Sequence, residues 1–232
     1  MVSVLCAPGG EDVDEQWFSP SFWGDNAVPV SAGGRGSAWF VWSPKGPLVL
    51  RHYRRGGLIA RLSERRYLFT GDRRTRSFAE FRLLSELRSE GLPVPKPVAA
   101  LVEKQGVFSY EAAILIERIE GALPLPEHPE VTDKALWYQV GKTIAGFHRA
   151  GLDHVDLNCD NILVSDNGIY LIDFDRCRWR QRSPGPARWK EKNLQRLRRS
   201  VEKRVPQGAA GKQRLWQELL AGYEGQPSWK DA

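Results

Sequence analysis

Residues 151–178 read GLDHVDLNCDNILVSDNGIYLIDFDRCR and form the most informative stretch of the sequence. It contains the pattern His154-x-Asp156-Leu157-x-x-x-Asn161 and, 17 residues after Asp156, the run Asp173-Phe174-Asp175. The four fixed positions of the first pattern would arise by chance in a chain of this length about once in a thousand cases, before the second run is counted. The spacing is therefore a specific signal.

This spacing matches the catalytic loop and the metal-binding strand of a phosphotransferase. Phosphoryl transfer needs a carboxylate to accept the proton of the attacking hydroxyl group, and an amide oxygen and a second carboxylate to hold Mg²⁺. We expect Asp156 to be the catalytic base and Asn161 and Asp173 to be the metal ligands. ATP and Mg²⁺ are the cofactors that this chemistry requires.

The segment between the two metal ligands predicts a β-hairpin. Apolar runs at 162–164 and 169–172 flank a turn that contains Asn167-Gly168, a strong two-residue hairpin signal. Such a hairpin would bring Asn161 and Asp173 side by side.

Two more residues of the stretch have expected roles. His154 is expected to brace the loop through hydrogen bonds rather than to take part in the chemistry. Asp175 stands where protein kinases have glycine, and a second Mg²⁺, a substrate hydroxyl group and Arg176 all remain open as its partner.

The N-terminal half of the chain predicts a small sheet and one helix. Runs rich in β-branched and aromatic residues at 39–42, 48–53 and 113–119 indicate strands. At 77–90, apolar residues recur at the period of one helical face before Gly91 ends the pattern. Strands first and helices later are typical of an α+β fold.

The C-terminal half is mainly helical in its pattern. An apolar stripe from Trp137 to Phe147 predicts a helix that Thr132-Asp133 caps and Gly151 ends, with His148 as an ordinary helix residue. Further stripes at 194–205 and 215–223 indicate two more helices. A segment rich in glycine and proline at 120–129 separates this half from the first, so we expect an N-terminal lobe at 1–119 and a C-terminal lobe at 120–232.

Candidate nucleotide contacts lie in the N-terminal half. The glycine cluster that includes Gly34 and Gly36 can let backbone N–H groups approach phosphates. Arg51 follows Gly36 by 15 residues, where a kinase-like fold places its phosphate-contacting lysine, and Glu80 is its expected partner. An arginine is a planar fork rather than a compact ammonium, so its phosphate contacts would differ.

The strand at 113–119 is expected to lead into the C-terminal lobe and to border the nucleotide. Adenine would meet the backbone groups of Glu117 and Ile119, which side-chain identity cannot reveal.

The charge of the chain is concentrated in one segment. The net charge is +6, but residues 176–204 hold twelve basic and two acidic residues, a net +10, so the rest of the chain carries −4. An anionic substrate is one possible partner of this segment. A membrane headgroup layer and a solvated helix face remain open for the segment as a whole. A second basic patch lies at 61–76, in a predicted hairpin.

Composition excludes several other classes of protein. Hydrophobic residues are 41% and charged residues 27%, close to a globular average, so disorder and a coiled coil are disfavoured. No run approaches the roughly 18 apolar residues of a spanning helix, and the N-terminus lacks the pattern of a secretory signal, so we expect a cytoplasmic protein. Three cysteines without metal-ligand spacing indicate neither a disulfide framework nor a zinc site.

Three stretches of the sequence resemble the protein-kinase-like sugar kinases of lipopolysaccharide synthesis. They read RHYRRGGLI from Arg51, GLPVPKPVAA from Gly91 and GKTIAGFHRAGLDHVDLN from Gly141, and they are most similar to those kinases that act on 3-deoxy-D-manno-octulosonic acid (Kdo). The resemblance spans roughly residues 17–223. It departs from the protein-kinase pattern at Arg51 and Asp175.

This resemblance implies a bilobal protein-kinase-like fold. The N-terminal ATP-binding lobe would hold a small antiparallel sheet and one helix, and the C-terminal lobe, mainly helical, would hold the catalytic and acceptor-binding residues. The implied reaction moves the γ-phosphate of ATP to the 4-hydroxyl of Kdo on a lipid A precursor, in lipopolysaccharide core biosynthesis. The protein would work peripherally at the cytoplasmic face of the inner membrane. With such an acceptor, which carries a carboxylate and phosphates, Arg176, Arg178 and Arg180 just beyond the metal strand would contact the anionic substrate.

Other functions remain open at this point. A kinase of the same fold for heptose or another small molecule would keep Asp156, Asn161 and Asp173. A protein kinase is disfavoured, because the chain after Asp175 is short and lacks an Ala-Pro-Glu element. A non-catalytic basic adaptor for a membrane or a nucleic acid is opposed by the intact catalytic trio, and no nucleic-acid partner is expected.

Overall fold

The computed structural model describes residues 1–30, 38–53, 67–68, 75–105, 109–180 and 187–225. The chain divides into two compact units. The first unit comprises Met1–Glu86 and Pro95–Glu120, and the second comprises Leu87–Val94 and Gly121–Ala232.

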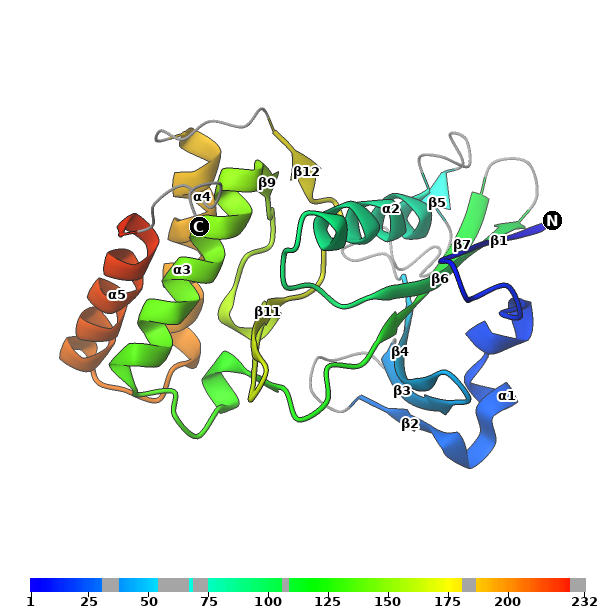
Figure 1. Cartoon of the computed structure of the whole chain (residues 1–232), viewed down its shortest axis with the longest axis horizontal. Coiled ribbons are helices and arrows are strands. Elements are labelled where there is room, and N and C mark those ends of the chain that lie inside the picture. The colour runs from blue at the N-terminus through cyan, green and yellow to red at the C-terminus, as the bar shows by residue number, and fades with distance from the viewer. Residues whose placement is uncertain (31–37, 54–66, 69–74, 106–108, 181–186, 226–232) are drawn as a thin grey trace. The chain divides into compact units, whose positions relative to one another are not determined.

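A seven-stranded antiparallel sheet forms the first unit (Figure 1). The strand order is β1-β6-β7-β4-β3-β2, and β5 pairs with β7. The strands are β1 (Val2–Cys6), β2 (Ala27–Pro29), β3 (Ala38–Ser43), β4 (Gly46–His52), β5 (Tyr67–Leu68), β6 (Pro97–Gln105) and β7 (Ser109–Glu117). The three strands expected from the sequence are β3, β4 and β7, although β7 begins four residues earlier and ends before Ile119.

Strand β6 has a central place that the sequence pattern does not reveal. Its first six residues are all buried, so it lacks the alternation of a half-exposed strand. Pro97, Ala99 and Ala100 also have low strand propensity. Both signals for a strand are therefore missing, and pairing with β1 and β7 supplies the stability instead.

The two faces of the sheet are covered by different elements. Buried Trp17, Phe18 and Trp23, from the short turns η1 (Glu15–Phe18) and α1 (Pro20–Trp23), pack with Leu50 and Leu115 in one core cluster. The other face carries the helix α2 (Arg76–Ser89), which lies beside β6 and β7 in Figure 1.

The helix α2 matches the expected helix closely. Its apolar positions Phe78, Phe81, Leu84 and Leu87 are all buried, which explains their spacing in the sequence. The hydroxyl group of Ser77 donates to the carbonyl of Leu101 at 2.9 Å, so the start of the helix is tied to β6.

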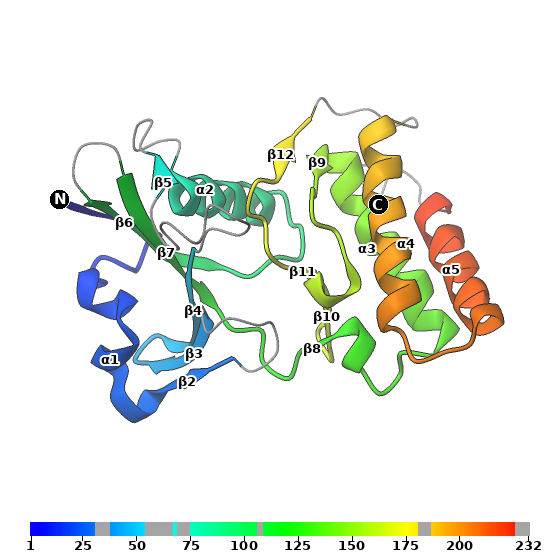
Figure 2. The same cartoon turned by 180° about the vertical axis from the view of Figure 1, so that it is seen from behind.

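Three long helices dominate the second unit (Figure 2): α3 (Lys134–Ala150), α4 (Arg188–Arg204) and α5 (Ala209–Glu224). The expected cap of α3 is present, because the carboxylate of Asp133 accepts the N–H of Ala135 at 2.9 Å. Gly151 ends the helix with φ 92°, a left-handed conformation that favours glycine. Among the helices of the described residues, none has the length and apolar character needed to cross a membrane.

The helices α3 and α5 approach each other at two glycines. A Cβ atom at Gly141 would lie 2.0 Å from the carbonyl oxygen of Leu219, and one at Gly222 would lie 2.0 Å from that of Tyr138. Only glycine permits this backbone contact.

The hairpin of the second unit has its turn at the expected place. The strands β10 (Ile162–Ser165) and β11 (Gly168–Leu171) pair antiparallel, with Ser165 opposite Gly168. The short strand β8 (Leu123–Pro124) adds to β10, and β9 (Leu152–Asp153) pairs with β12 (Arg178–Trp179). An α+β fold with an N-terminal antiparallel sheet and a mainly helical C-terminal part is thus confirmed.

Candidate active site

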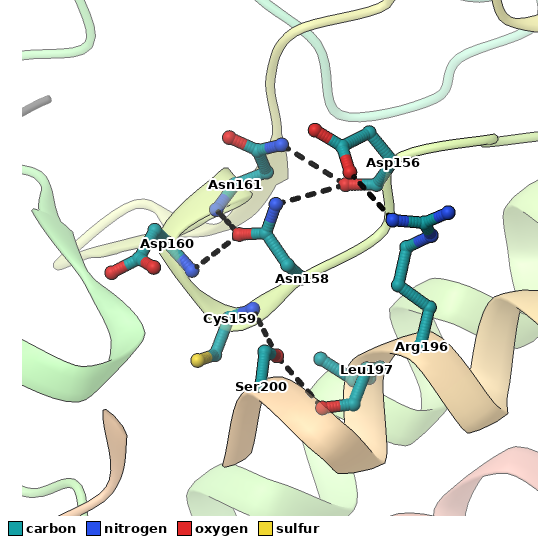
Figure 3. A network of polar contacts seen from close by, with 8 residues as sticks. All are labelled: Asp156, Asn158, Cys159, Asp160, Asn161, Arg196, Leu197 and Ser200. Carbon is teal, nitrogen blue, oxygen red and sulfur yellow. Dashed lines mark hydrogen bonds and ion pairs between the residues drawn. The ribbon is translucent and has the colours of Figure 1, made fainter. Parts of the chain in front are cut away.

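The loop that carries Asp156 is held by two amide side chains (Figure 3). The side-chain nitrogens of Asn158 and Asn161 both donate to the backbone carbonyl of Asp156, each at 3.0 Å. The amide oxygen of Asn158 accepts the N–H groups of Asp160 at 2.9 Å and Asn161 at 3.1 Å, which caps the turn η6 (Cys159–Asn161). These contacts fix the backbone of Asp156, while its carboxylate stays half-exposed.

The end of the hairpin brings Asn161 and Asp173 together. The backbone N–H of Ile172 donates to the carbonyl of Asn161 at 3.1 Å, and Asp173 follows directly. Asp173 has φ 63°, a conformation that is uncommon for a residue with a side chain. Such backbone strain clusters at functional sites. The structure therefore places Asp156, Asn161 and Asp173 around one loop and hairpin of the second unit.

His154 connects the loop to the strand that precedes Asp173. Its Nε2 atom lies 3.0 Å from the carbonyl oxygen of Ile172, so Nε2 carries the proton and donates. Burial lowers the pKa of His154, and the neutral imidazole is the form that this geometry needs. Its ring also packs edge-on against buried Phe174 at 5.1 Å. These contacts agree with the expected bracing role.

A buried polar residue of α4, Asn193, holds the start of the same loop. Its Oδ1 atom accepts the backbone N–H of His154 at 3.0 Å, and its Nδ2 atom donates to Oδ1 of Asp153 at 3.0 Å. Asp153 in turn accepts Nε and Nη2 of Arg180, at 3.0 and 2.9 Å, on its other oxygen. The guanidinium of Arg180, a residue of the basic segment, is thus bound to Asp153.

The network continues into α3 and α5 through His148. Its Nε2 atom lies 3.3 Å from Oδ1 of Asn193, and its Nδ1 atom lies 2.7 Å from the hydroxyl group of Tyr223. Because the Asn193 oxygen can only accept, His148 donates through Nε2 and accepts from Tyr223. Burial lowers the pKa of His148 to about 3, so the ring stays neutral. His148 is therefore more than an ordinary helix residue.

Cations of the basic segment surround the loop. Nη1 of Arg196 lies 3.2 Å from Oδ1 of Asp156. Arg204 makes a two-atom contact with Asp160, through Nε at 3.0 Å and Nη2 at 2.9 Å. Hydrogen bonding with Asp160 raises the pKa of Arg204, which stays charged.

The expected substrate residues after Asp173 lie in an exposed stretch. Arg176 has φ 64°, and its Nε atom is 4.0 Å from the carboxylate of Asp175. Arg178 is exposed on β12, opposite Asp153 of β9. A second Mg²⁺, a substrate hydroxyl group and Arg176 were the possible partners of Asp175. Of these, the structure shows the contact with Arg176.

The donors at the end of the hairpin suit Mg²⁺. The nitrogen of the Asn161 amide faces Asp156, which leaves its oxygen on the opposite side (Figure 3). Among the described residues, no group of three or more His, Cys, Asp and Glu side chains could hold a metal ion. A site with one amide oxygen and one carboxylate fits an ion that takes its other ligands from phosphates and water, as Mg²⁺ does in phosphoryl-transfer sites.

The expected pair in the first unit forms a compact charged cluster. Nη2 of Arg51 lies 2.5 Å from both carboxylate oxygens of Glu80, and the hydroxyl group of Tyr53 donates to the same carboxylate at 2.5 Å. Arg51 pairs with Ile114 across β4 and β7, on the face of the sheet that carries α2. Burial beside the Glu80 carboxylate raises the pKa of Tyr53 well above its usual value, so the phenol remains a donor.

The other residues expected to bind the nucleotide are Glu117, Ile119, Gly34 and Gly36. Glu117 ends β7, and its backbone N–H donates to the carbonyl of Lys96 at 2.8 Å. Ile119 lies beyond the strand. Gly34 and Gly36 lie outside the described residues, as does most of the basic patch at 61–76.

Sequence reasoning missed four residues of these clusters: Tyr53, Asp153, Asn158 and Asn193. Tyr53 directly follows β4 and lies two positions after Arg51, a spacing that places both side chains on one face of an extended chain and could have been read from the sequence. Asn193 is a polar residue on the apolar stripe of α4, at the spacing of Lys190 and Leu197, and all three are buried. A polar residue at a core position is a signal for a buried hydrogen bond.

Comparisons with known proteins identify the family. Residues 20–223 match the lipopolysaccharide kinase (Kdo/WaaP) family. The 3-deoxy-D-manno-octulosonic acid kinase of Stenotrophomonas maltophilia (strain K279a) is 55% identical over 188 residues, which cover 80% of this chain and 74% of that protein. The protein of the same name from Xanthomonas euvesicatoria pv. vesicatoria (strain 85-10) is 54% identical over 193 residues, 82% of this chain and 76% of that protein.

Solved structures support the same fold at lower identity. WaaP in complex with acyl carrier protein aligns over 97% of this chain and 90% of that chain, with a TM-score of 0.58 and 15% identity. An aminoglycoside-3'-phosphotransferase of type VIII aligns over 88% of this chain and 90% of that chain, with a TM-score of 0.56 and 16% identity. These similarities establish a protein-kinase-like fold. With the match over residues 20–223, they show that the chain belongs to the lipopolysaccharide kinase (Kdo/WaaP) family.

Proposed function

We propose that this protein is a 3-deoxy-D-manno-octulosonic acid kinase. It transfers the γ-phosphate of ATP to the 4-hydroxyl of Kdo on a lipid A precursor, a step of lipopolysaccharide core biosynthesis. Relatives that are 53–55% identical carry the name of this enzyme, which supports the choice of Kdo over heptose or another sugar. The observation that carries the proposal is the placement of Asp156, Asn161 and Asp173 around one loop and hairpin.

The residues of the second unit divide the chemistry among them. Asp156 accepts the proton of the attacking hydroxyl group, because its carboxylate is half-exposed while its backbone is fixed. Asn161 and Asp173 hold Mg²⁺, which when bound neutralises charge on the phosphates. His154 keeps the loop and the strand in register through Ile172.

The residues of the first unit are assigned to ATP. The guanidinium of Arg51, oriented by Glu80 and Tyr53, presents charge for phosphate oxygens, and the backbone near Glu117 and Ile119 meets adenine. In this assignment residues 1–119 form the ATP-binding lobe. Residues 120–232 then form the catalytic and acceptor-binding lobe.

A lipid-linked acceptor places the reaction at a membrane surface. Kdo is a sugar with a carboxylate and the lipid A precursor carries phosphates, so the exposed basic residues of α4 match its charge. Arg176 and Arg178 offer further positive charge after the metal-binding strand. We place the protein peripherally on the cytoplasmic face of the inner membrane, attached by electrostatic attraction that salt would weaken.

Purified protein with Mg²⁺, ATP and a Kdo-bearing lipid A precursor tests the proposal. Mass spectrometry should locate one new phosphate on the 4-hydroxyl of Kdo. Asp156→Asn should lower kcat by about 100-fold or more, at or above the lower limit of the range for a lost general base, with little change in ATP affinity. Asp166→Asn, at the exposed turn of the hairpin, is the matched control and should be active.

Two results would refute the proposal. Phosphorylation of a heptose acceptor in preference to Kdo would assign the chain to another substrate. Turnover of Asp156→Asn near that of Asp166→Asn would remove Asp156 from the role of base.

A further inference from the structure

The contact between Arg196 and Asp156 calls for an explanation beyond stability. The two side chains are 48% and 52% exposed, and an ion pair that is this exposed typically contributes only about 0–1 kcal/mol. Figure 3 shows Arg196 reaching from α4 to the Asp156 carboxylate, away from the amides that fix the loop backbone. The pair is therefore accessible to a bound substrate.

Arg196 differs from its neighbours in how its donors are used. Its Nη1 atom meets Asp156, and within the described part of the chain its Nε and Nη2 atoms have no protein partner. Three other arginines of the basic segment are engaged elsewhere in the protein. Arg180 binds Asp153, Arg198 binds Gln213 and Glu202, and Arg204 binds Asp160.

The reaction brings the acceptor to the same place. A hydroxyl group that gives its proton to Asp156 must lie within about 2.6–3.2 Å of that carboxylate. Because Arg196 Nη1 lies 3.2 Å from the same carboxylate, a second group on the sugar ring, a few ångströms from the hydroxyl, is within reach of the guanidinium. Arginine recognises a carboxylate with two parallel N–H donors, a geometry that lysine cannot provide.

We propose that Arg196 is a specificity-determining residue that binds the carboxylate of the acceptor sugar beside the catalytic base. This inference rests on the proposed function, and it assigns the acceptor contact to α4 rather than to Arg176 or Arg178. Arg196 selects an acidic sugar over a neutral one, and it positions the 4-hydroxyl at Asp156 by holding a second point of the same ring.

The surface around Arg196 suits an acceptor with further negative charge. Exposed basic residues follow Arg196 along one side of α4 at steps of three and four positions: Arg188, Lys192, Arg199 and Lys203. At about 1.5 Å per residue, this row extends about 12 Å from Arg196 toward Arg188 and about 10 Å toward Lys203. Phosphates of a lipid-linked acceptor can lie along this row while the sugar carboxylate meets Arg196.

A pair of acceptors tests the assignment. One is the Kdo-bearing lipid A precursor, and the other is the same compound with the Kdo carboxylate converted to its neutral methyl ester. For the free carboxylate, Arg196→Gln should raise the acceptor KM by about 10- to 100-fold, the range for a charged hydrogen-bonded contact. The KM for ATP should change less than about twofold, because the contact is to the acceptor.

The methyl ester separates this contact from a general effect on Asp156. The wild type should prefer the free acid by about 10-fold or more, and Arg196→Gln should lose that preference. Arg196→Lys should restore part of it through its charge alone. Arg214→Gln, which removes an exposed arginine on α5, is the matched control and should keep the wild-type preference.

Opposite results would overturn the assignment. If Arg196→Gln retains the wild-type preference for the free acid, or if it slows both acceptors equally, Arg196 does not bind the carboxylate. A wild-type chain that phosphorylates neither acceptor would instead overturn the proposed function, and the assignment with it.

Discussion

Replacing Asn193 by alanine tests whether tertiary contacts hold the catalytic loop in place. Asn193 is 4% exposed and bonds to the backbone of His154, the side chain of His148 and the carboxylate of Asp153. Alanine would leave the backbone N–H of His154 and the Nε2–H of His148 without their acceptor. It would also remove the N–H group that donates to Asp153.

The expected loss can be estimated from these contacts. A buried group without its partner costs about 1–3 kcal/mol, so three disturbed groups predict a loss of about 3–5 kcal/mol after partial relaxation. That is a large share of a typical unfolding free energy of about 5–15 kcal/mol. At about 2–4 °C per kcal/mol for a chain of this size, the Tm should fall by roughly 10 °C. The loop that carries Asp156 also loses an anchor, so kcat should fall at least about tenfold at a temperature where the variant is folded.

Asn193→Asp distinguishes the hydrogen bonds from packing alone. The aspartate keeps an oxygen that accepts the backbone N–H of His154. Its second oxygen replaces the amide nitrogen of Asn193, which lies 3.0 Å from Oδ1 of Asp153. Two carboxylates at this distance favour a shared proton in the folded state, which raises the pKa of one of them. The folded state then binds more protons than the unfolded state, so the deficit relative to the wild type should shrink as the pH falls from 8 to 5.

Thermal unfolding followed by circular dichroism measures both variants, with Asn167→Ala at the exposed hairpin turn as the control. A Tm of Asn193→Ala within about 2 °C of this control would refute the reasoning, because it would mean that the buried hydrogen bonds contribute almost nothing. A deficit of Asn193→Asp that does not vary with pH would refute the electrostatic part.

Three other substitutions test separate features. Gly141→Ala should lower the unfolding free energy by about 3 kcal/mol or more, because its Cβ would lie 2.0 Å from the carbonyl oxygen of Leu219. The control Gly146→Ala is on the same helix with its nearest contact at 3.8 Å, so it should be neutral or stabilising by up to about 1 kcal/mol. Equal Tm values for the two variants would contradict this expectation. His148 has a folded-state pKa of about 3 against 6.5 in the unfolded state, so its stabilising effect is present above pH 6.5 and about 2 kcal/mol of it is lost by pH 5. Denaturant titration of His148→Gln should therefore show a smaller fall in the unfolding free energy between pH 6.5 and pH 5 than the wild type. The same dependence of unfolding free energy on pH in both proteins would count against a neutral buried His148. Glu80→Gln should raise the KM for ATP by about tenfold, with a smaller effect on the acceptor KM, because Arg51 loses the carboxylate that orients it. Steady-state kinetics measure both constants. An unchanged KM for ATP would oppose the nucleotide role of Arg51 and Glu80.

Much of the fold can be predicted because its signals are local. The helix α2 follows from a periodic stripe, and α3 follows from a stripe with a cap at Asp133 and a stop at Gly151. Strand β6 is different, because a strand whose first six residues are all buried has no alternation of apolar and polar residues. Its place in the sheet depends on pairing with β1 and β7, from both sides of it in the sequence.

Local signals in the sequence are enough to predict the loop that carries Asp156 and the hairpin that follows it. Asp156 and Asp173 are 17 positions apart, and the backbone between them is short enough for turn and strand propensities to bring Asn161 beside Asp173. The side chains that surround this loop depend on tertiary packing. Arg196 meets Asp156 across 40 positions and Tyr223 meets His148 across 75. Helical periodicity reports which face of a helix is buried, but the side chain on the other side of the contact is set by how α3, α4 and α5 pack.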